Sequence, residues 1–468
     1  MDGQENNSSA IKTAALIAGP VLALAAAFFL RSRGWSFEAQ TVAAVTVLCA
    51  LWWMTEPIPI PATSLIPLAV FPLSGALTKT QVAQSFGHWL ILLLMGGFII
   101  SQAMEKSGTH KRLAFAMIKA VGGKGKRLVF GFMAASALLS MWISNTATAL
   151  MLLPIAIAVI SQSEDEELTV PLLLGICYAA SIGGMGTPLG TPPNLVFVDQ
   201  YKKLTGNEVD FISWMKKAVP LVLILFPIAG FLITRKMKGT SEVKLPSSGR
   251  WRQEEIRTLI VFIIIALAWV FRKFPGQGWS GFLGFPNASD ADVALLGVVL
   301  LFLIPNGEGK GEKLLDWKSA VNIPWGILLL FSGGLTVATG FEVVGLSEAV
   351  GKQLAALVEF HPYLLILIIC LSVTFLTEVT SNTASTLLLL PILGETALAS
   401  ELIKDPAVIM IPATISASCA FMLPVATPPN AIIFGSGKIS IKEMAKEGVI
   451  LNFVAAFIIS TFFYFVYS

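Results

Sequence analysis

Hydrophobic and polar positions alternate along this chain in long blocks rather than with the short period of a soluble helix or strand. Because a helix needs about 20 apolar residues to cross a bilayer, this pattern predicts an all-α polytopic membrane protein. The expected spans, about eleven in number, are 11–30, 38–54, 58–76, 88–107, 170–200, 211–234, 257–273, 290–305, 322–345, 406–436 and 445–467.

Two further apolar stretches, 127–160 and 364–398, carry the same polar phrase near their middles. The phrase Ser144-Asn145-Thr146-Ala147 returns in the second half of the chain as Ser381-Asn382-Thr383-Ala384, and Leu-Leu-Pro-Ile follows each copy. Ser, Asn and Thr are typical of helix N-caps. Each stretch is therefore either a span interrupted at its centre or a re-entrant hairpin with the phrase at its tip.

A second motif follows each phrase inside the expected spans 170–200 and 406–436. It reads Thr191-Pro192-Pro193-Asn194 in the first and Thr427-Pro428-Pro429-Asn430 in the second, at nearly the same separation as the two phrases. Proline interrupts helices, so we expect both spans to be broken there. Irregular backbone at membrane depth is tolerated only where it is buried in protein or lines a cavity. Two matched copies predict one site built from two halves, as in secondary transporters.

The distribution of positive charge favours hairpins over interrupted spans. If both stretches return to their starting side and the N-terminus is inside, 21 of the 32 Lys and Arg residues lie inside. The two most basic segments, 106–127 and 235–257, then share that side, as the positive-inside rule requires. The C-terminus would lie outside.

The repeat extends to other residues and sets the expected domain boundaries. Trp89, Gly96 and Gly97 match Trp325, Gly333 and Gly334. We expect an N-terminal transmembrane helix at 1–37, one repeat at 38–234, a cytoplasmic linker at 235–256 and a second repeat at 257–468. Each repeat would hold five spans and one hairpin. An odd number of spans inserts the two copies in opposite directions, which gives an inverted-topology repeat with opposed hairpins.

Composition narrows the class of protein. Hydrophobic residues make up 55% of the 468 positions and charged residues 13%, against about 25% charged residues in soluble domains. The four cysteines lie in apolar segments without CxxC spacing, which predicts buried free thiols. The sequence contains no HExxH or GxSxG motif, so an enzyme is not expected. A net charge of +3 gives no reason to expect nucleic-acid binding.

The paired motifs have the chemistry of an anion site with adjacent cations. A helix that begins at each phrase exposes unpaired N–H groups, which attract carboxylate, sulfate or phosphate. Hydroxyls of Ser140 and Thr377, with carbonyls of Gly190 and Ala426, form hard-oxygen sets suited to sodium. Cations would offset the cost of bringing a dianion to mid-membrane. Glu378 has Met141 as its counterpart, and this asymmetry favours a structural or tuning role. His88, next to Trp89, is expected to be interfacial.

These motifs resemble those of the divalent anion:sodium symporter family, the INDY-like di- and tricarboxylate carriers, over nearly the whole chain. The resemblance implies a homodimer, a scaffold, a moving transport domain and two opposed hairpins. It implies one sodium site at Ser140, Ser144, Asn145 and Gly190, and another at Thr377, Thr380, Asn382 and Ala426. It implies substrate contacts from Ser144, Asn145, Thr146, Thr191 and Pro192 in one half and from Ser381, Asn382, Thr383, Thr427 and Pro428 in the other.

The leading hypothesis is sodium-coupled symport of C4-dicarboxylates such as succinate, malate or fumarate, by elevator-type alternating access. The expected partners are a small dianionic carboxylate, the lipid bilayer and a second copy of the chain, and no organic cofactor is expected. The expected location is a bacterial inner membrane. The alternatives are sodium-independent dicarboxylate exchange, or a carrier of citrate or sulfate. A channel is a different class, but channels need a continuous pore rather than a central site.

Overall fold

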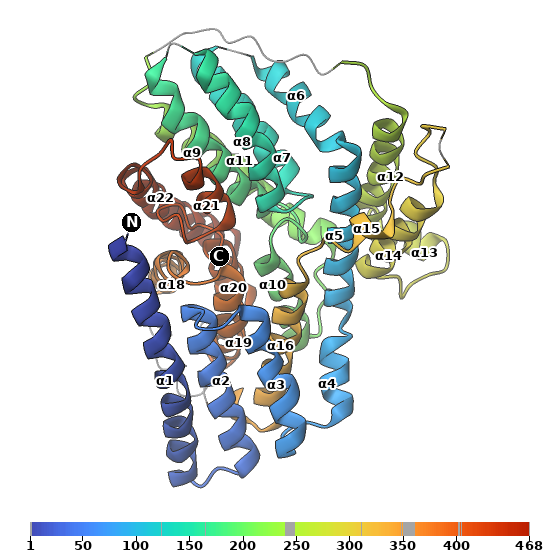
Figure 1. The fold of residues 1–468 in the computed structure, drawn as a ribbon. Helices are drawn as coiled ribbons and strands as arrows, with labels where there is room; N and C mark the ends of the chain where they lie inside the picture. Colours follow the sequence, from blue (N-terminus) through green and yellow to red (C-terminus); the bar gives the residue numbers. More distant parts are fainter. Residues whose placement is uncertain are drawn as a thin grey trace.

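The computed structural model describes residues 2–467 apart from positions 123, 164, 239–248, 310, 348, 350–360, 401, 402 and 404. The described residues form α-helices joined by turns, which confirms the expected all-helical class (Figure 1). The elements are α1 (Asp2–Ser32), α2 (Phe37–Thr55), α3 (Ile60–Ser74), α4 (Lys79–Phe86), α5 (Trp89–Ser107), α6 (Thr109–Val121), α7 (Gly125–Ser140), α8 (Asn145–Gln162), η1 (Glu166–Leu168), α9 (Thr169–Gly184), α10 (Pro192–Thr205), α11 (Phe211–Thr234), α12 (Gln253–Val270), α13 (Gly278–Phe282), α14 (Asp290–Leu303), α15 (Trp317–Ala320), α16 (Trp325–Val343), α18 (Pro362–Thr377), α19 (Asn382–Leu398), α20 (Ala407–Ser416), α21 (Pro428–Gly435) and α22 (Ile441–Tyr467).

Seven helical segments in the described part of the chain are long and apolar enough to cross a membrane. They are Lys12–Ser32, Phe37–Thr55, Lys79–Ser107, Asn145–Gln162, Phe211–Thr234, Trp325–Val343 and Ile441–Val466. Several other expected spans coincide with shorter apolar helices. The spans 170–200 and 406–436 are each divided, into α9 with α10 and α20 with α21.

Helices of the first repeat pack on helices of the second, and equivalent helices of the two repeats make equivalent contacts. Helix α5 packs on α14, and its counterpart α16 packs on α3; likewise α10 packs on α19, and α21 on α8. Small residues allow this approach, because a methyl group built on Gly96 would lie 2.7 Å from the Cβ of Ala294. One built on the equivalent Gly333 would lie 2.5 Å from the carbonyl oxygen of Ser64. These contacts between the repeats therefore occur in matched pairs, as expected for two copies of one fold.

The two phrase-bearing stretches each fold into a pair of helices that pack on one another. The expected hairpin 127–160 corresponds to α7 and α8, which turn at residues 141–144. The expected hairpin 364–398 corresponds to α18 and α19, which turn at residues 378–381. In Figure 1, α7 and α8 rise to the upper end of the molecule, whereas α19 extends into its lower half.

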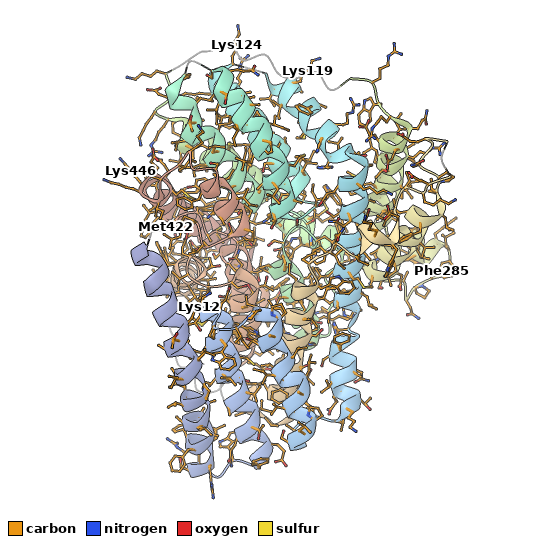
Figure 2. The ribbon with its side chains drawn as sticks, in the orientation of Figure 1. Lys12, Lys119, Lys124, Phe285, Met422 and Lys446 are labelled. Atoms are coloured by element: carbon orange, nitrogen blue, oxygen red, sulfur yellow. The ribbon has the colours of Figure 1, made fainter. Side chains whose placement is uncertain are left out.

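The basic segments of the chain meet one another. Arg112 Nη1 donates a hydrogen bond to the carbonyl of Gly249 at 2.9 Å, and Thr109 Oγ1 donates to the carbonyl of Glu255 at 3.1 Å. Lys119 and Lys124, of the same basic segment, project at the upper end of the molecule in Figure 2. The segment 106–127 and the end of the linker therefore share one side. Helix α12 begins at Gln253, within the expected linker.

Candidate substrate and cation site

Both hairpin tips are built by the N-capping that the phrases suggest. Ser144 caps α8, and its Oγ accepts the backbone N–H of Ala147 at 3.1 Å. Ser381 caps α19 in the same way, with Ala384 N at 3.4 Å. Each cap satisfies one of the four unpaired N–H groups at a helix start. The remaining N–H groups at each helix start carry a partial positive charge, which attracts anions.

Behind each tip, the asparagine of the phrase is held by a hydroxyl from the incoming helix. Ser140 Oγ donates to Asn145 Oδ1, and Thr377 Oγ1 is paired in the same way with Asn382 Oδ1. Thr377 Oγ1 also lies 2.9 Å from the carbonyl of Ala417. Ser140 and Thr377 are fully buried. Each predicted cation set thus has its hydroxyl and amide oxygen in direct contact.

The interrupted helices are held open by the asparagines of the Thr-Pro-Pro-Asn motifs. Asn194 Nδ2 donates to the carbonyls of Thr187 at 2.7 Å and Gly184 at 3.0 Å. Asn430 Nδ2 makes the equivalent bonds, to Ala420 at 2.9 Å and to Leu423 at 3.1 Å. These bonds pair carbonyls that the missing helical turns leave free. Sequence reasoning quoted both asparagines within the motifs but assigned them no role.

Backbone oxygens converge at the break of the first repeat. A methyl group built on Gly190 would lie 2.4 Å from the carbonyl oxygen of Gly184 and 2.9 Å from that of Ser140. One built on Gly184 would lie 2.8 Å from Asn145 Oδ1. Oxygen ligands of this kind suit hard cations. Gly184 was not predicted as part of this set, because it lies far from Asn145 in the sequence and only the fold brings them together.

A single cavity of about 1020 Å³ joins the two hairpin tips and the two breaks. All ten predicted substrate residues line it, as do Gly190, Thr380 and Ala426 from the predicted sodium sets. Ser140 and Thr377 are not among the lining residues. The structure therefore brings the predicted substrate residues together around one cavity. Their roles in binding substrate or sodium remain predictions. The lining residues include Ser144, Asn145, Thr146, Thr191, Pro192, Ser381, Asn382, Thr383, Thr427 and Pro428.

Another part of the cavity lining comes from α1, the turn between α2 and α3, α5 and α16. It supplies the ionisable lining residues in the described part of the chain, Lys12 and Glu56. Glu56 has a left-handed backbone, with φ of 47°. No Arg or Lys comes from the four repeated motifs. An anion at the tips would therefore be held by N–H groups and neutral side chains, which also permits its release.

Thr380 differs from the other predicted sodium ligands in its contacts. Its Oγ1 lies 2.8 Å from the carbonyl of Leu376 and 2.7 Å from Ser385 Oγ. The hydroxyl hydrogen can serve one of these two acceptors, and the oxygen keeps a lone pair. The side chain of Thr380, which lines the cavity, is therefore already hydrogen-bonded within its own hairpin.

His88 contacts the interrupted helix α10. Its Nε2 lies 3.3 Å from Asp199 Oδ1, and Asp199 is 2% exposed. Lys203 Nζ lies 2.9 Å from the other oxygen of this carboxylate. Sequence reasoning missed this contact, because His88 and Asp199 lie in different helices far apart along the chain.

Comparison with known proteins agrees with this architecture. A family model described as the sodium:sulfate symporter transmembrane region matches residues 10–467. The chain belongs to this family. The resemblance to the divalent anion:sodium symporters is thereby confirmed, and so is the expectation of a transporter rather than an enzyme.

Dicarboxylate transporters and a transporter of known structure are among the proteins similar to this chain. A sodium-dependent dicarboxylate transporter SdcS of Staphylococcus saprophyticus is 37% identical over 473 residues, covering 96% of this chain and 90% of the relative. SdcS of Staphylococcus aureus is 38% identical over 474 residues, with the same coverage. The crystal structure of the Alcanivorax borkumensis YdaH transporter is similar in fold, with a TM-score of 0.60 at 14% identity. The similarity covers 85% of this chain and 88% of that chain.

Proposed function

We propose that this protein is a sodium-coupled symporter of C4-dicarboxylates such as succinate, malate and fumarate. The observation that carries the proposal is the single cavity between two capped helix starts, one from each repeat. Two N-termini facing one cavity suit an anion with two charged ends, because each carboxylate can meet one helix start. The SdcS relatives, named as sodium-dependent dicarboxylate transporters, support the same substrate class and coupling ion.

The chemistry of the four motifs, which contain no Lys or Arg, supports sodium coupling. A dianion that meets dipoles and neutral donors at the hairpin tips remains costly to place at membrane depth. A sodium ion at each oxygen set, one near Asn145 and one near Asn382, would offset this charge. The convergence of oxygens at Gly190 supports the first of these sites. Sodium is transported with the substrate, so it is cargo rather than a resident cofactor.

The proposed membrane arrangement has about eleven spans and two opposed re-entrant hairpins in an inverted repeat. The crosswise packing of the repeats and the shared side of the basic segments support it. The N-terminus would be cytoplasmic, the C-terminus external and the protein a homodimer in a bacterial inner membrane. The hairpins and the interrupted helices α9–α10 and α20–α21 would move as a transport domain against a scaffold, in an elevator-type cycle.

Uptake into proteoliposomes tests the proposal. We expect labelled succinate to accumulate against its own gradient when sodium is high outside, and to show only background uptake when choline replaces sodium. Saturation and uphill accumulation distinguish a carrier from a channel. Uptake that is unchanged without sodium but requires internal dicarboxylate would favour an exchanger instead. Stronger competition by citrate or sulfate than by malate and fumarate would reassign the substrate.

A further inference from the structure

Two charged side chains lie in the cavity lining outside the repeated motifs. Lys12 of α1 and Glu56 at the end of α2 line the same cavity as the two hairpin tips. Both residues are exposed, and neither side chain makes an ion pair or hydrogen bond with the part of the chain that the structure describes. Their charges are therefore not neutralised there, and they face a cavity whose other described lining residues are neutral.

The packing of α1 on α2 places these two charges at one level. A turn joins the two helices at residues 33–36, and they run antiparallel. Trp52 Nε1 of α2 donates a hydrogen bond to the carbonyl of Ala15 in α1 at 3.0 Å. Lys12 precedes Ala15 by three residues, and Glu56 follows Trp52 by four. Because an α-helix has about 3.6 residues per turn, both charges lie about one turn beyond this bond, and Figure 2 shows Lys12 at the level of the upper end of α2.

Glu56 occupies a position that its local structure disfavours. Its backbone is left-handed, with φ of 47° and ψ of 50°, and its N–H donates to the carbonyl of Trp52 at 2.9 Å to end α2. Glycine or asparagine usually occupies this position at a helix end. Pro57 follows and favours an extended conformation in the residue before it, and the helix end carries a partial negative charge that repels a carboxylate. The local fold therefore gives no reason for glutamate, and unfavourable backbone conformations of this kind cluster at functional sites.

The two charges and the repeated motifs belong to different parts of the proposed mechanism. The ten predicted substrate residues lie on the hairpins and interrupted helices that would move, whereas α1 and α2 belong to the scaffold. Lys12 begins the span Lys12–Ser32, and the N-terminus would be cytoplasmic, so the two charges lie at the cytoplasmic end of the cavity. They face the site while it is open to the cytoplasm and stay behind when the transport domain moves. Their effect is therefore confined to one face of the membrane.

We propose that Lys12 and Glu56 set the affinity of the cytoplasm-facing cavity for the two transported ions, with Lys12 attracting the dicarboxylate and Glu56 attracting sodium. This inference rests on the proposed sodium-coupled function and its membrane arrangement. Coulomb interactions act over about 10 Å at physiological salt, so neither residue needs to contact the ion. Each charge opposes the other for a given ion. Glu56 thereby weakens binding of the dianion on the cytoplasmic face, where the dianion must leave.

The charge-neutralising variants Lys12→Gln and Glu56→Gln of the full chain test the inference in membrane vesicles of both orientations. Inside-out vesicles present the cytoplasmic face to the medium, and right-side-out vesicles present the external face. In inside-out vesicles at saturating sodium, we expect Lys12→Gln to raise the KM for labelled succinate about threefold and Glu56→Gln to lower it about threefold, because a screened charge changes affinity modestly. The double variant should lie near the wild type. At saturating succinate, the half-saturating sodium concentration should move in the opposite direction for each variant.

Salt and matched controls identify the cause of these shifts. Added choline chloride should reduce both, because it screens charges, and right-side-out vesicles should show neither. Lys119→Gln, at an exposed residue of the basic side, and Glu38→Gln, at the opposite end of α2, lie outside the cavity lining and should leave all constants unchanged. Shifts of the same sign for Lys12→Gln and Glu56→Gln, or equal shifts on both faces, would overturn the inference.

Chemical modification tests the role of charge on protein that has already folded. Glu56→Cys can be modified in inside-out vesicles with a negatively or a positively charged methanethiosulfonate, and the four native cysteines are buried. The negative adduct should return the succinate KM on the cytoplasmic face toward the wild-type value, and the positive adduct should lower it further. Equal effects of the two adducts would show that bulk rather than charge is responsible, and would overturn the inference.

The outcomes keep this inference distinct from the proposed function. Wild-type uptake that ignores sodium on both faces would refute the coupling itself. Sodium-dependent wild-type uptake, with the same succinate KM on the cytoplasmic face in the wild type, Lys12→Gln and Glu56→Gln, would refute only the role of the two charges.

Discussion

Val379 occupies in the second hairpin the position that Trp142 occupies in the first, yet their surroundings are opposite. The Trp142 ring stacks on Phe211 with centroids 5.8 Å apart and meets Phe262 of α12 edge-on at 5.4 Å. Val379 is 63% exposed and lines the cavity. Both hairpin tips line the cavity, but at this one position the first hairpin packs a side chain against α12 and the second exposes one to the cavity.

This asymmetry predicts a difference in chemical accessibility. Val379→Cys should react with a charged thiol reagent more than ~10-fold faster than Trp142→Cys, because thiol reactivity follows exposure. The four native cysteines are buried and free, as the sequence predicted, so the wild type gives a low background. Equal labelling rates for the two variants, measured by mass shift on the purified protein, would contradict the asymmetry.

The close approach of oxygens at Gly190 predicts intolerance to a single methyl group. Gly190→Ala would place a carbon 2.4 Å from the carbonyl oxygen of Gly184, so we expect succinate uptake to fall to background. Ala426→Gly is the matched control, because Ala426 is its counterpart and the second repeat already accepts a methyl group there. That variant should keep most of its uptake. Normal transport by Gly190→Ala would exclude a cation set at this point.

A third prediction concerns the pH dependence of stability. Burial raises the pKa of Glu208, but hydrogen bonds from Lys273 and Arg272 outweigh it and hold the pKa below its ordinary value. Arg272 Nη2, just after the end of α12, donates at 2.8 Å to this glutamate in the turn between α10 and α11. The unfolded chain therefore binds the proton more readily than the folded protein. The ion pairs of Glu208 stabilise the folded protein above the pKa of the unfolded chain, about 4.3. This stabilisation is lost as the pH falls through the lower pKa of Glu208 in the folded protein.

Thermal unfolding of Glu208→Gln measures this contribution. At pH 7 the variant should be less stable by about 1 kcal/mol, a value reduced for partial exposure, and the difference should shrink as the pH falls below about 4. Glu342→Gln, at an exposed glutamate near the end of α16, is the control and should show no difference at either pH. A deficit in Glu208→Gln that is constant with pH would contradict the assigned ion pairs.

The repeated motifs carried most of what sequence reasoning could predict about the site. Polar, helix-breaking residues inside apolar stretches are costly unless they line a cavity, and the repeat fixed which positions are equivalent. This reasoning placed the breaks near residues 144, 191, 381 and 427, and all four line one cavity. The caps at Ser144 and Ser381 follow from local chemistry alone, which is why they were predictable.

Contacts between segments that are far apart along the chain could not be predicted from the sequence. Trp142 and Trp269 stack with centroids 6.4 Å apart although they belong to different repeats. The bond between Asp199 and His88 likewise depends on how α10 meets α5. The asymmetry of Glu378 was visible as a difference from Met141, but its bonds to backbone N–H groups beyond α20 required the tertiary structure. A sequence repeat identifies equivalent positions, but it does not show which hydrogen-bond donors from other helices contact the side chains there.

The central claim is that two half-sites share one dicarboxylate, and the paired variants Asn145→Ala and Asn382→Ala test it most directly. Each should reduce sodium-driven succinate uptake in proteoliposomes to background while the Tm of the purified protein stays near that of the wild type. Asn322→Ala, on the exposed surface, should transport normally. Near-normal uptake by either Asn145→Ala or Asn382→Ala, with normal folding, would contradict a site that needs both halves.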